Sequence, residues 1–173
     1  MNLSVRPMPL EETGMIIDYF YNATPEFLEN MGVDPTRLPE RGNWRERYER
    51  DYAQPIERRR SFMVLWELER RAIGFSSVDK IKFGNEAFMH LHVTDAALRE
   101  AGHGAECVRR TVAIYFETFK LQRLFCEPNA FNVAPNRTMQ KAGFRYVKTH
   151  MTVPGVLNYH QAVTRWVMER SGE

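Results

Sequence analysis

The residues best suited to binding a charged group form a short glycine-containing loop, 99–105, directly before a predicted helix. The first backbone N–H groups of a helix have no partner within it, and the helix dipole places about half a positive charge there. Gly102 and Gly104 carry no Cβ, so an oxyanion can approach the backbone closely. We interpret the loop as a pyrophosphate-binding site formed by Arg99, Glu100, Ala101, Gly102, His103, Gly104 and Ala105.

The elements that position this loop follow from hydrophobic periodicity. Residues 87–93 read as a strand, and apolar residues from Ala105 to Phe119 recur every three or four positions, as on one face of a helix. Further strands are expected over 3–6, 62–66, 73–78, 123–127, 145–153 and 161–168, and helices over 11–22, 25–52 (broken by prolines) and 134–141.

This order of elements predicts an α/β fold. Strands and helices mix along the chain, which favours a central mixed, mostly antiparallel sheet of about six to seven strands with helices on both faces. A chain of 173 residues with 43% hydrophobic residues suits one domain, 1–173, with a sizeable core. The exposed edges of such a sheet would allow a homodimer.

Composition limits the classes of partner. No apolar run is long enough to span a bilayer, and the first residues, Met1 to Arg6, have no signal-peptide pattern, so we expect a cytoplasmic protein without a membrane partner. Cys107 and Cys126 fall in a helix and a strand pattern, where buried free thiols are expected. No metal-ligand spacing occurs, and a net charge of +2 gives no case for nucleic acid.

A dinucleotide site is the competing interpretation of the glycine loop. Gly102, Gly104 and Cys107 give G-x-G-x-x-C, so the third glycine needed for tight helix–strand packing is missing. The polar stretch 94–98 also separates the strand from the glycines, whereas in the dinucleotide fold they follow at once. Both features disfavour this interpretation.

Two motifs resemble those of the GCN5-related N-acetyltransferase (GNAT) family. Arg99-x-x-Gly102-x-Gly104 fits the family's Gln/Arg-x-x-Gly-x-Gly/Ala signature at the start of its third helix. A second, more specific segment matches the family's strand-five glutamate, loop asparagine and Lys-x-Gly-Phe ending, with Glu127, Asn132, Lys141, Gly143 and Phe144. The run 132–137 is similar to the subgroup that includes the ribosomal-protein N-acetyltransferases.

The resemblance implies acetyl transfer from acetyl-coenzyme A to a primary amine, by direct attack in a ternary complex. The glycine loop would bind the cofactor's pyrophosphate, and the fourth and fifth strands would splay apart. Leu91, His92 and Val93 would then lie along the pantetheine arm, with the N–H of Val93 or a neighbour binding the oxyanion. Asn132 and Asn136 would reach the cofactor from the other side.

Glu127 and His92 are the candidate catalytic bases. Glu127 occupies the family's strand-five glutamate position, but a carboxylate there can also be a plain hydrogen-bond acceptor. His92 projects from the same strand face as His90 and titrates near neutrality, although a hydrogen-bonded histidine beside the core fits equally well. Met139 stands where many members carry the tyrosine that protonates the leaving thiolate. By elimination, the candidates for the group that protonates this thiolate are Tyr146, Tyr115 and water.

The acceptor is expected to be a protein N-terminus, a lysine or a small amine, bound by residues 22–60 and 154–160. The arginines between Arg41 and Arg60 allow two interpretations: a solvated helix with Glu–Arg pairs, or a wall of the acceptor pocket suited to an acidic or peptide-like amine. The alternative function is a non-catalytic acyl-coenzyme A sensor or scaffold, which Met139 alone favours.

Overall fold

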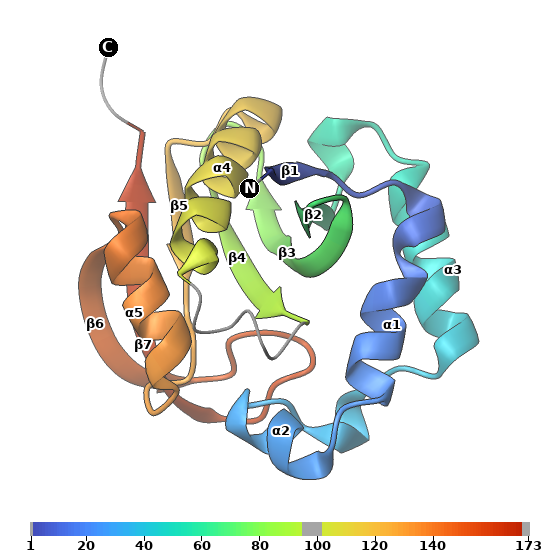
Figure 1. Ribbon diagram of the computed structural model, residues 1–173, viewed down its shortest axis with the longest axis horizontal. Coiled ribbons are helices and arrows are strands. Elements are labelled where there is room, and N and C mark those ends of the chain that lie inside the picture. The colour runs from blue at the N-terminus through green and yellow to red at the C-terminus, as the bar shows by residue number, and fades with distance from the viewer. Residues whose placement is uncertain (1, 95–101, 171–173) are drawn as a thin grey trace.

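The computed structural model describes residues 2–94 and 102–170, and these form one seven-stranded sheet with helices on both faces (Figure 1). The strand order is β1-β2-β3-β4-β5-β7-β6, and only β4 and β5 are parallel neighbours. The strands are β1 (Leu3–Pro7), β2 (Phe62–Leu68), β3 (Arg71–Lys82), β4 (Glu86–Val93), β5 (Arg123–Cys126), β6 (Arg145–Thr152) and β7 (Gln161–Glu169).

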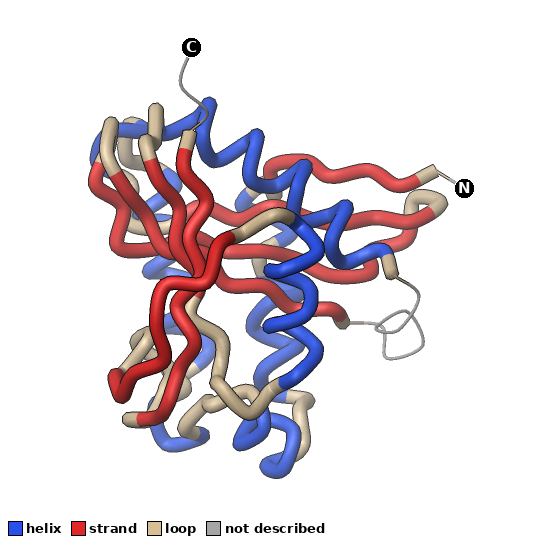
Figure 2. Tube along the Cα trace, turned by 90° about the vertical axis from the view of Figure 1, so that its left-hand side faces the viewer, coloured by secondary structure: helices blue, strands red, loops and turns tan. Residues whose placement is uncertain are grey.

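The helices divide between the two faces of the sheet (Figure 1). One face carries α1 (Gly14–Tyr21), α2 (Pro25–Asn30) and α3 (Arg41–Tyr52), and the other carries α4 (His103–Phe119) and α5 (Val133–Ala142). Figure 2 shows the strong twist of the sheet, whose strands turn from nearly horizontal close to the N-terminus to steeply inclined at the far edge.

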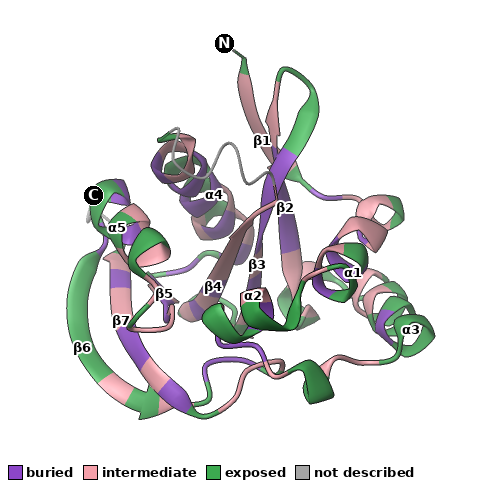
Figure 3. Cartoon of the chain, turned by 60° about the horizontal axis from the view of Figure 1, so that its bottom comes forward, coloured by how far each residue is buried: buried purple, intermediate pink, exposed green. Residues whose placement is uncertain are grey.

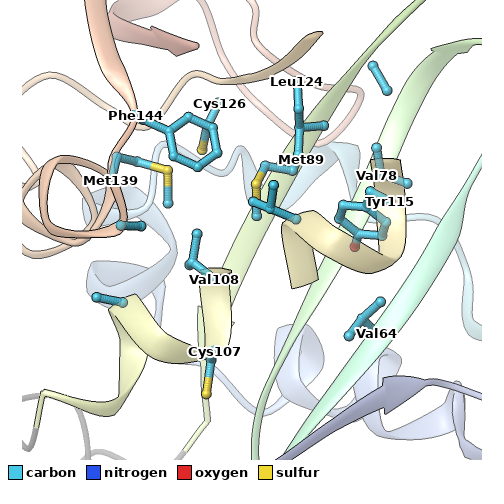
Figure 4. Close-up of a cluster of buried hydrophobic side chains, with 14 of the residues drawn as sticks. Val64, Val78, Met89, Cys107, Val108, Tyr115, Leu124, Cys126, Met139 and Phe144 are labelled. Carbon is cyan, nitrogen blue, oxygen red and sulfur yellow. The ribbon is translucent and has the colours of Figure 1, made fainter. Parts of the chain in front are cut away.

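The core under α4 is built by its apolar stripe. Val108, Tyr115 and Phe119 are fully buried, and they pack with Met89 and Leu124 from the sheet (Figure 4). Because such side chains recur every three or four residues, one face of α4 covers the centre of the sheet. Within this core the indole of Trp66 donates a 2.8 Å hydrogen bond to the hydroxyl of Thr111.

A second, aromatic core lies under α1 and α3. Phe20 and Trp44 pack at a centroid distance of 5.6 Å above Phe75 and Met63 of the sheet.

The outer strand β6 is exposed along most of its length (Figure 3). No helix in the described ranges is long and apolar enough to cross a membrane.

The predicted fold class and element order are confirmed, with differences in length. The expected 73–78 strand extends over 71–82, because β3 pairs with both β2 and β4. The broken helical region 25–52 consists of α2, a 3-10 turn at 35–37 and α3. Asp34 caps the turn that Pro35 begins, and proline at the first position of a turn cannot continue a preceding helix. Both cysteines are free and buried, as predicted.

Candidate active site

The sheet opens between its two parallel strands. Their last pair is Met89 with Cys126, and the β4 residues 90–93 pair only with β3 in the described part of the chain. Beyond Cys126 the chain stays with β7, because the amide of Thr164 donates to the Pro128 carbonyl at 3.1 Å. We call this divergence the β4–β5 split (Figure 3). It is the splay that the family resemblance implies, and it leaves the main chain of 90–92 facing an opening.

The amino end of α4 supplies amides that have no acceptor within the helix. Gly102 is its N-cap, with a φ of +80° that favours glycine, and a glycine has no side chain with which to cap the helix. The amides of His103, Gly104 and Ala105 are therefore in the first turn, where a helix has no internal acceptors. A Cβ at Gly104 would meet only the Thr138 side chain, at 3.5 Å, so the backbone there is accessible. This geometry suits an anion, and the binding of a pyrophosphate here stays a prediction.

Three residues of the predicted loop, Arg99, Glu100 and Ala101, lie outside the described residues. Their assignment to the pyrophosphate site stays a prediction.

Asn132 and Asn136 differ in how far the protein itself uses them. The side chain of Asn132, at the N-cap of α5, makes no cap hydrogen bond and lines a large cavity. Asn136 donates through Nδ2 to the carbonyls of Asn129 and Asn132 at 3.0 and 2.8 Å, and its Oδ1 accepts from the Trp166 indole. Asn132 thus has a side chain available to a ligand, whereas Asn136 ties the start of α5 to β7.

A cavity of about 1060 Å³ lies between the sheet and the α1–α3 layer and reaches the β4–β5 split. Its walls come from α1 and α3, from β3 and β4, and from the connection between β6 and β7. This volume is in the upper range of small-ligand sites. Polar groups concentrate where the cavity meets the split, with Asp79, His90, Glu127 and Asn132.

Glu127, the first residue after β5, is held by two basic side chains. Its side chain is 4% exposed, Arg165 Nε donates to Oε1, and His150 Nε2 lies 3.7 Å from the same oxygen. Burial lowers the pKa of His150 more than Glu127 raises it, so this imidazole is neutral near pH 7. Arg165 is therefore the charged partner that balances the carboxylate.

His90 is the first β4 residue beyond the split, and it is paired with Asp79 of β3. Their Nε2 and Oδ1 atoms lie 3.1 Å apart and are both shielded from solvent. Burial lowers the pKa of His90, but the Asp79 carboxylate outweighs it, so the pKa of His90 is raised above its ordinary value. Burial likewise raises the pKa of Asp79, yet the attraction of His90 leaves that pKa lowered.

His92 shares the cavity-facing side of β4 with His90, as predicted, but sits in an aromatic cluster. Its ring stacks on Phe75 at a centroid distance of 4.9 Å and meets Tyr19 and Phe20 edge-on at 5.2 Å. Burial, together with the nearby His90, lowers the pKa of His92 to about 3. An imidazole with that pKa is neutral but weakly basic at pH 7.

Met139 is fully buried in the core beneath α4, near Cys126 and Phe144 (Figure 4). Neither of the tyrosines considered in its place lines the cavity. Tyr115 is buried and donates to the Ser76 hydroxyl at 3.0 Å, and burial raises its pKa. Tyr146 is 52% exposed on β6. Neither residue is therefore placed to protonate a thiolate at the split.

Comparison with known proteins identifies the family of this chain. The family model described as "Acetyltransferase (GNAT) domain" matches residues 2–145. The chain belongs to the GNAT acetyltransferase family. It is accordingly an acetyltransferase that uses acetyl-coenzyme A as its acyl donor. No curated protein matches the sequence closely.

Solved structures share the fold of this GNAT acetyltransferase at low identity. A spermidine N-acetyltransferase from Vibrio cholerae, in complex with CoA and spermine, has a TM-score of 0.76 at 12% identity, covering 97% of this chain and 95% of that one. The ribosomal L7/L12 α-N-protein acetyltransferase RimL, with coenzyme A, has a TM-score of 0.74 at 14% identity, covering 98% and 94%. An aminoglycoside acetyltransferase with coenzyme A has a TM-score of 0.72 at 16% identity, covering 98% and 95%.

The sequence did not reveal Asp79 or Arg165 as parts of the site. Asp79 reaches His90 because Ser77 is paired with His90 in the β3–β4 register, which places Asp79 two residues along on the same face. The alternation of His90 and His92 was the sequence signal for the β4 side of this site. The structure brings His90, His92, Glu127 and Asn132 to one cavity, as a single site requires.

Proposed function

We propose that this acetyltransferase N-acetylates a primary amine, on a protein or a small molecule, by direct attack within a ternary complex. The β4–β5 split carries this proposal, because it lies between the amino end of α4 and the 1060 Å³ cavity. One side can take the acyl donor while the other takes the amine. Holding both reactants in one complex needs no covalent enzyme intermediate.

The proposed donor site uses mainly the backbone. The amides of Gly102 to Ala105 bind the pyrophosphate, with 99–101 completing the loop, and the main chain of Leu91, His92 and Val93 pairs with the pantetheine arm. Asn132 contacts the cofactor with its side chain from the opposite wall. Asn136 supports that wall through its bonds to Asn129 and Trp166.

His90 is the proposed base that takes the proton from the attacking ammonium. It is adjacent to the split, and with Nε2 turned toward Asp79 its Nδ1 is left to accept a proton. A pKa raised toward the operating pH suits this task. Glu127, anchored by Arg165, offers its carboxylate as a hydrogen-bond acceptor for the ammonium, and His92 forms the wall beside it.

A product assay tests the function. Purified protein is incubated with acetyl-coenzyme A and a panel of free-N-terminal peptides, lysine peptides and small amines, with thiol release and acetylated product measured together. We expect equal amounts of thiol and N-acetyl product for at least one amine. Thiol release without any acetylated amine, or no turnover across the panel, would contradict the proposal.

We also infer a cytoplasmic location and a homodimer. Two free buried cysteines fit a reducing compartment. The outer strand β6 exposes Tyr146, Val147 and Met151 at a sheet edge, where a second copy could pair. Sedimentation equilibrium at micromolar concentrations tests the dimer, and a monomer throughout would exclude it.

A further inference from the structure

Four arginines line the cavity from the α3 side, which lies across β4 from the β5–β7 strands that form the far edge of the split (Figure 1). Arg47 and Arg50 belong to α3, and Arg58 and Arg60 to the segment that leads into β2. All four are exposed at the rim, and none forms an ion pair with another described residue. These guanidinium groups are free to bind a ligand.

The acidic residues close to these arginines form no ion pair with them among the described residues. Asp51 lines the same end of the cavity, but its carboxylate accepts hydrogen bonds from the amides of Arg60 and Ser61 and from the Ser61 hydroxyl. Glu46 and Glu49 of α3 form no ion pair among the described residues. The Glu–Arg pairs that a purely solvated helix would use are therefore not made.

The neighbouring Arg59, by contrast, has a structural role. Its guanidinium lies 4.1 Å from the centre of the Tyr52 ring and donates to the Tyr52 carbonyl at 3.1 Å. Arg58 and Arg60, on either side of it, have no comparable contact and line the cavity instead. Arg59 therefore packs into the fold, whereas Arg58 and Arg60 line the cavity.

The two ends of the cavity thus differ in charge. At the split end, Glu127 is balanced by Arg165, whereas the Asp79 carboxylate lies beside His90 and stabilises an ammonium group when that imidazole is neutral. The α3 end has the four guanidinium groups and one carboxylate, that of Asp51, so positive charge is in excess there. Arginine binds carboxylate and phosphate oxygens through paired N–H donors. A cavity with these two ends complements a molecule that is positive at one end and negative at the other.

We infer that the acceptor is a primary amine that carries carboxylate or phosphate groups on its far side. This inference rests on the proposed function, because it places the amine at the split. The arginine end holds the anionic groups and directs the amine toward His90. An amine with several positive charges, such as a polyamine, is disfavoured there by like-charge repulsion.

Binding of matched amines to the coenzyme A-saturated protein tests the inference by calorimetry. One arm compares the peptide Ser-Asp-Asp-Glu with its isostere Ser-Asn-Asn-Gln, and the other compares phosphoethanolamine with ethanolamine. We expect the anionic member of at least one pair to bind about 10-fold more tightly, or more, since each exposed ion pair contributes up to about 5-fold. Rising salt should reduce this preference. A preference in the peptide pair identifies carboxylates as the anionic groups, and a preference in the phosphoethanolamine pair identifies phosphate.

Variants locate the effect. The double change Arg47→Gln with Arg50→Gln should remove most of the preference for the anionic amine and leave binding of coenzyme A unchanged. Arg45→Gln is the matched control, because Arg45 is an exposed arginine of the same helix outside the cavity lining, and it should keep the preference. Equal loss in the control and the double variant would overturn the inference.

The outcomes separate this inference from the proposed function. Acetylation of neutral and anionic amines with equal affinity, or tighter binding of cationic amines, overturns the inference and leaves the acetyltransferase proposal standing. Selective binding of the anionic amine without acetyl transfer supports the inference and contradicts the proposed reaction. Failure of both pairs to bind overturns the inference, whatever the product assay shows.

Discussion

The imidazole of His90 and the carboxylate of Asp79 lie 3.1 Å apart on neighbouring strands, at the point where β4 leaves β5. This pairing fixes the orientation of the ring, because Nε2 faces the carboxylate and Nδ1 is turned away from it. It also raises the pKa of His90 despite burial. A carboxylate that orients a histidine and stabilises its charged form is a common support for a general base.

Replacing Asp79 should move the acidic limb of the pH–rate profile. The reaction needs neutral His90, so kcat/KM rises with pH through the pKa of His90, which lies above its ordinary value in the wild type. In Asp79→Asn the attraction is lost while burial remains, so that pKa falls and the limb shifts to lower pH. Profiles of kcat/KM from pH 5 to 9, a range of about four units around the histidine pKa, measure the shift.

Three further variants complete that series. His90→Gln should remove the limb and reduce kcat/KM by about 100-fold, the lower end for loss of a general base. Glu127→Gln should raise KM for the amine and keep the limb, and His92→Phe should also keep it. A limb that stays in place in both Asp79→Asn and His90→Gln would exclude His90 as the base.

Gly104 allows the donor site to be tested without disturbing the fold. Gly104→Asp places a carboxylate beside the amides proposed to bind the pyrophosphate, and repulsion should weaken acetyl-coenzyme A binding by about 10-fold or more. Gly104→Ala adds only a methyl group, which meets the Thr138 side chain at an ordinary 3.5 Å. Calorimetric titrations of both variants, with circular dichroism as the check on folding, make the comparison. Equal affinities would show that the loop is misassigned.

The sequence predicted the scaffold well because its signals are local. The stripe from Ala105 to Phe119 and the strand patterns each lie within one element, and their order then limits the ways in which a sheet can form. The helical region 25–52 was correctly predicted to be broken by prolines, and Pro35 begins the turn at 35–37. The start of α3 was not predicted, because it is set by the Glu40 cap.

The candidate site was predicted only where a motif lies in one stretch of chain. The glycine loop, Glu127 and Asn132 belong to such stretches. The contact of Asp79 with His90 depends on the β3–β4 register, which shifts between Asp79 and Lys82, and Arg165 reaches Glu127 from β7. The pKa of His92 depends on rings from α1 and β3. Pairings between distant segments are not encoded in local periodicity.

Asn132 and Asn136 should separate ligand binding from stability. Asn132→Ala removes a side chain that caps nothing, so we expect weaker binding of acetyl-coenzyme A and an unchanged free energy of unfolding. Asn136→Ala removes three hydrogen bonds and leaves the Trp166 indole without its partner, which should destabilise the protein by about 2–3 kcal/mol. Urea unfolding and cofactor titration of both variants measure the two effects. A stable Asn136→Ala variant with impaired binding would reverse this assignment.

His92 should make the protein sensitive to acid. Its pKa is about 3 in the folded state and near 6.5 in the unfolded chain, so the unfolded state binds more protons between these values. This group therefore reduces stability as pH falls from about 6.5 toward 3. His92→Phe, which fits the cluster of Tyr19, Phe20 and Phe75, should weaken that dependence. Urea midpoints measured at pH 7 and pH 4.5, values chosen on either side of about 6.5, give the comparison.

Initial-rate kinetics with both substrates varied test the central claim most directly. Direct attack in a ternary complex predicts double-reciprocal lines that intersect, and Cys126→Ser should give the same pattern, because burial raises the pKa of the Cys126 thiol and keeps it from acting as a nucleophile. Parallel lines for the wild type, with activity lost in Cys126→Ser, would show an acyl-enzyme intermediate and contradict the account.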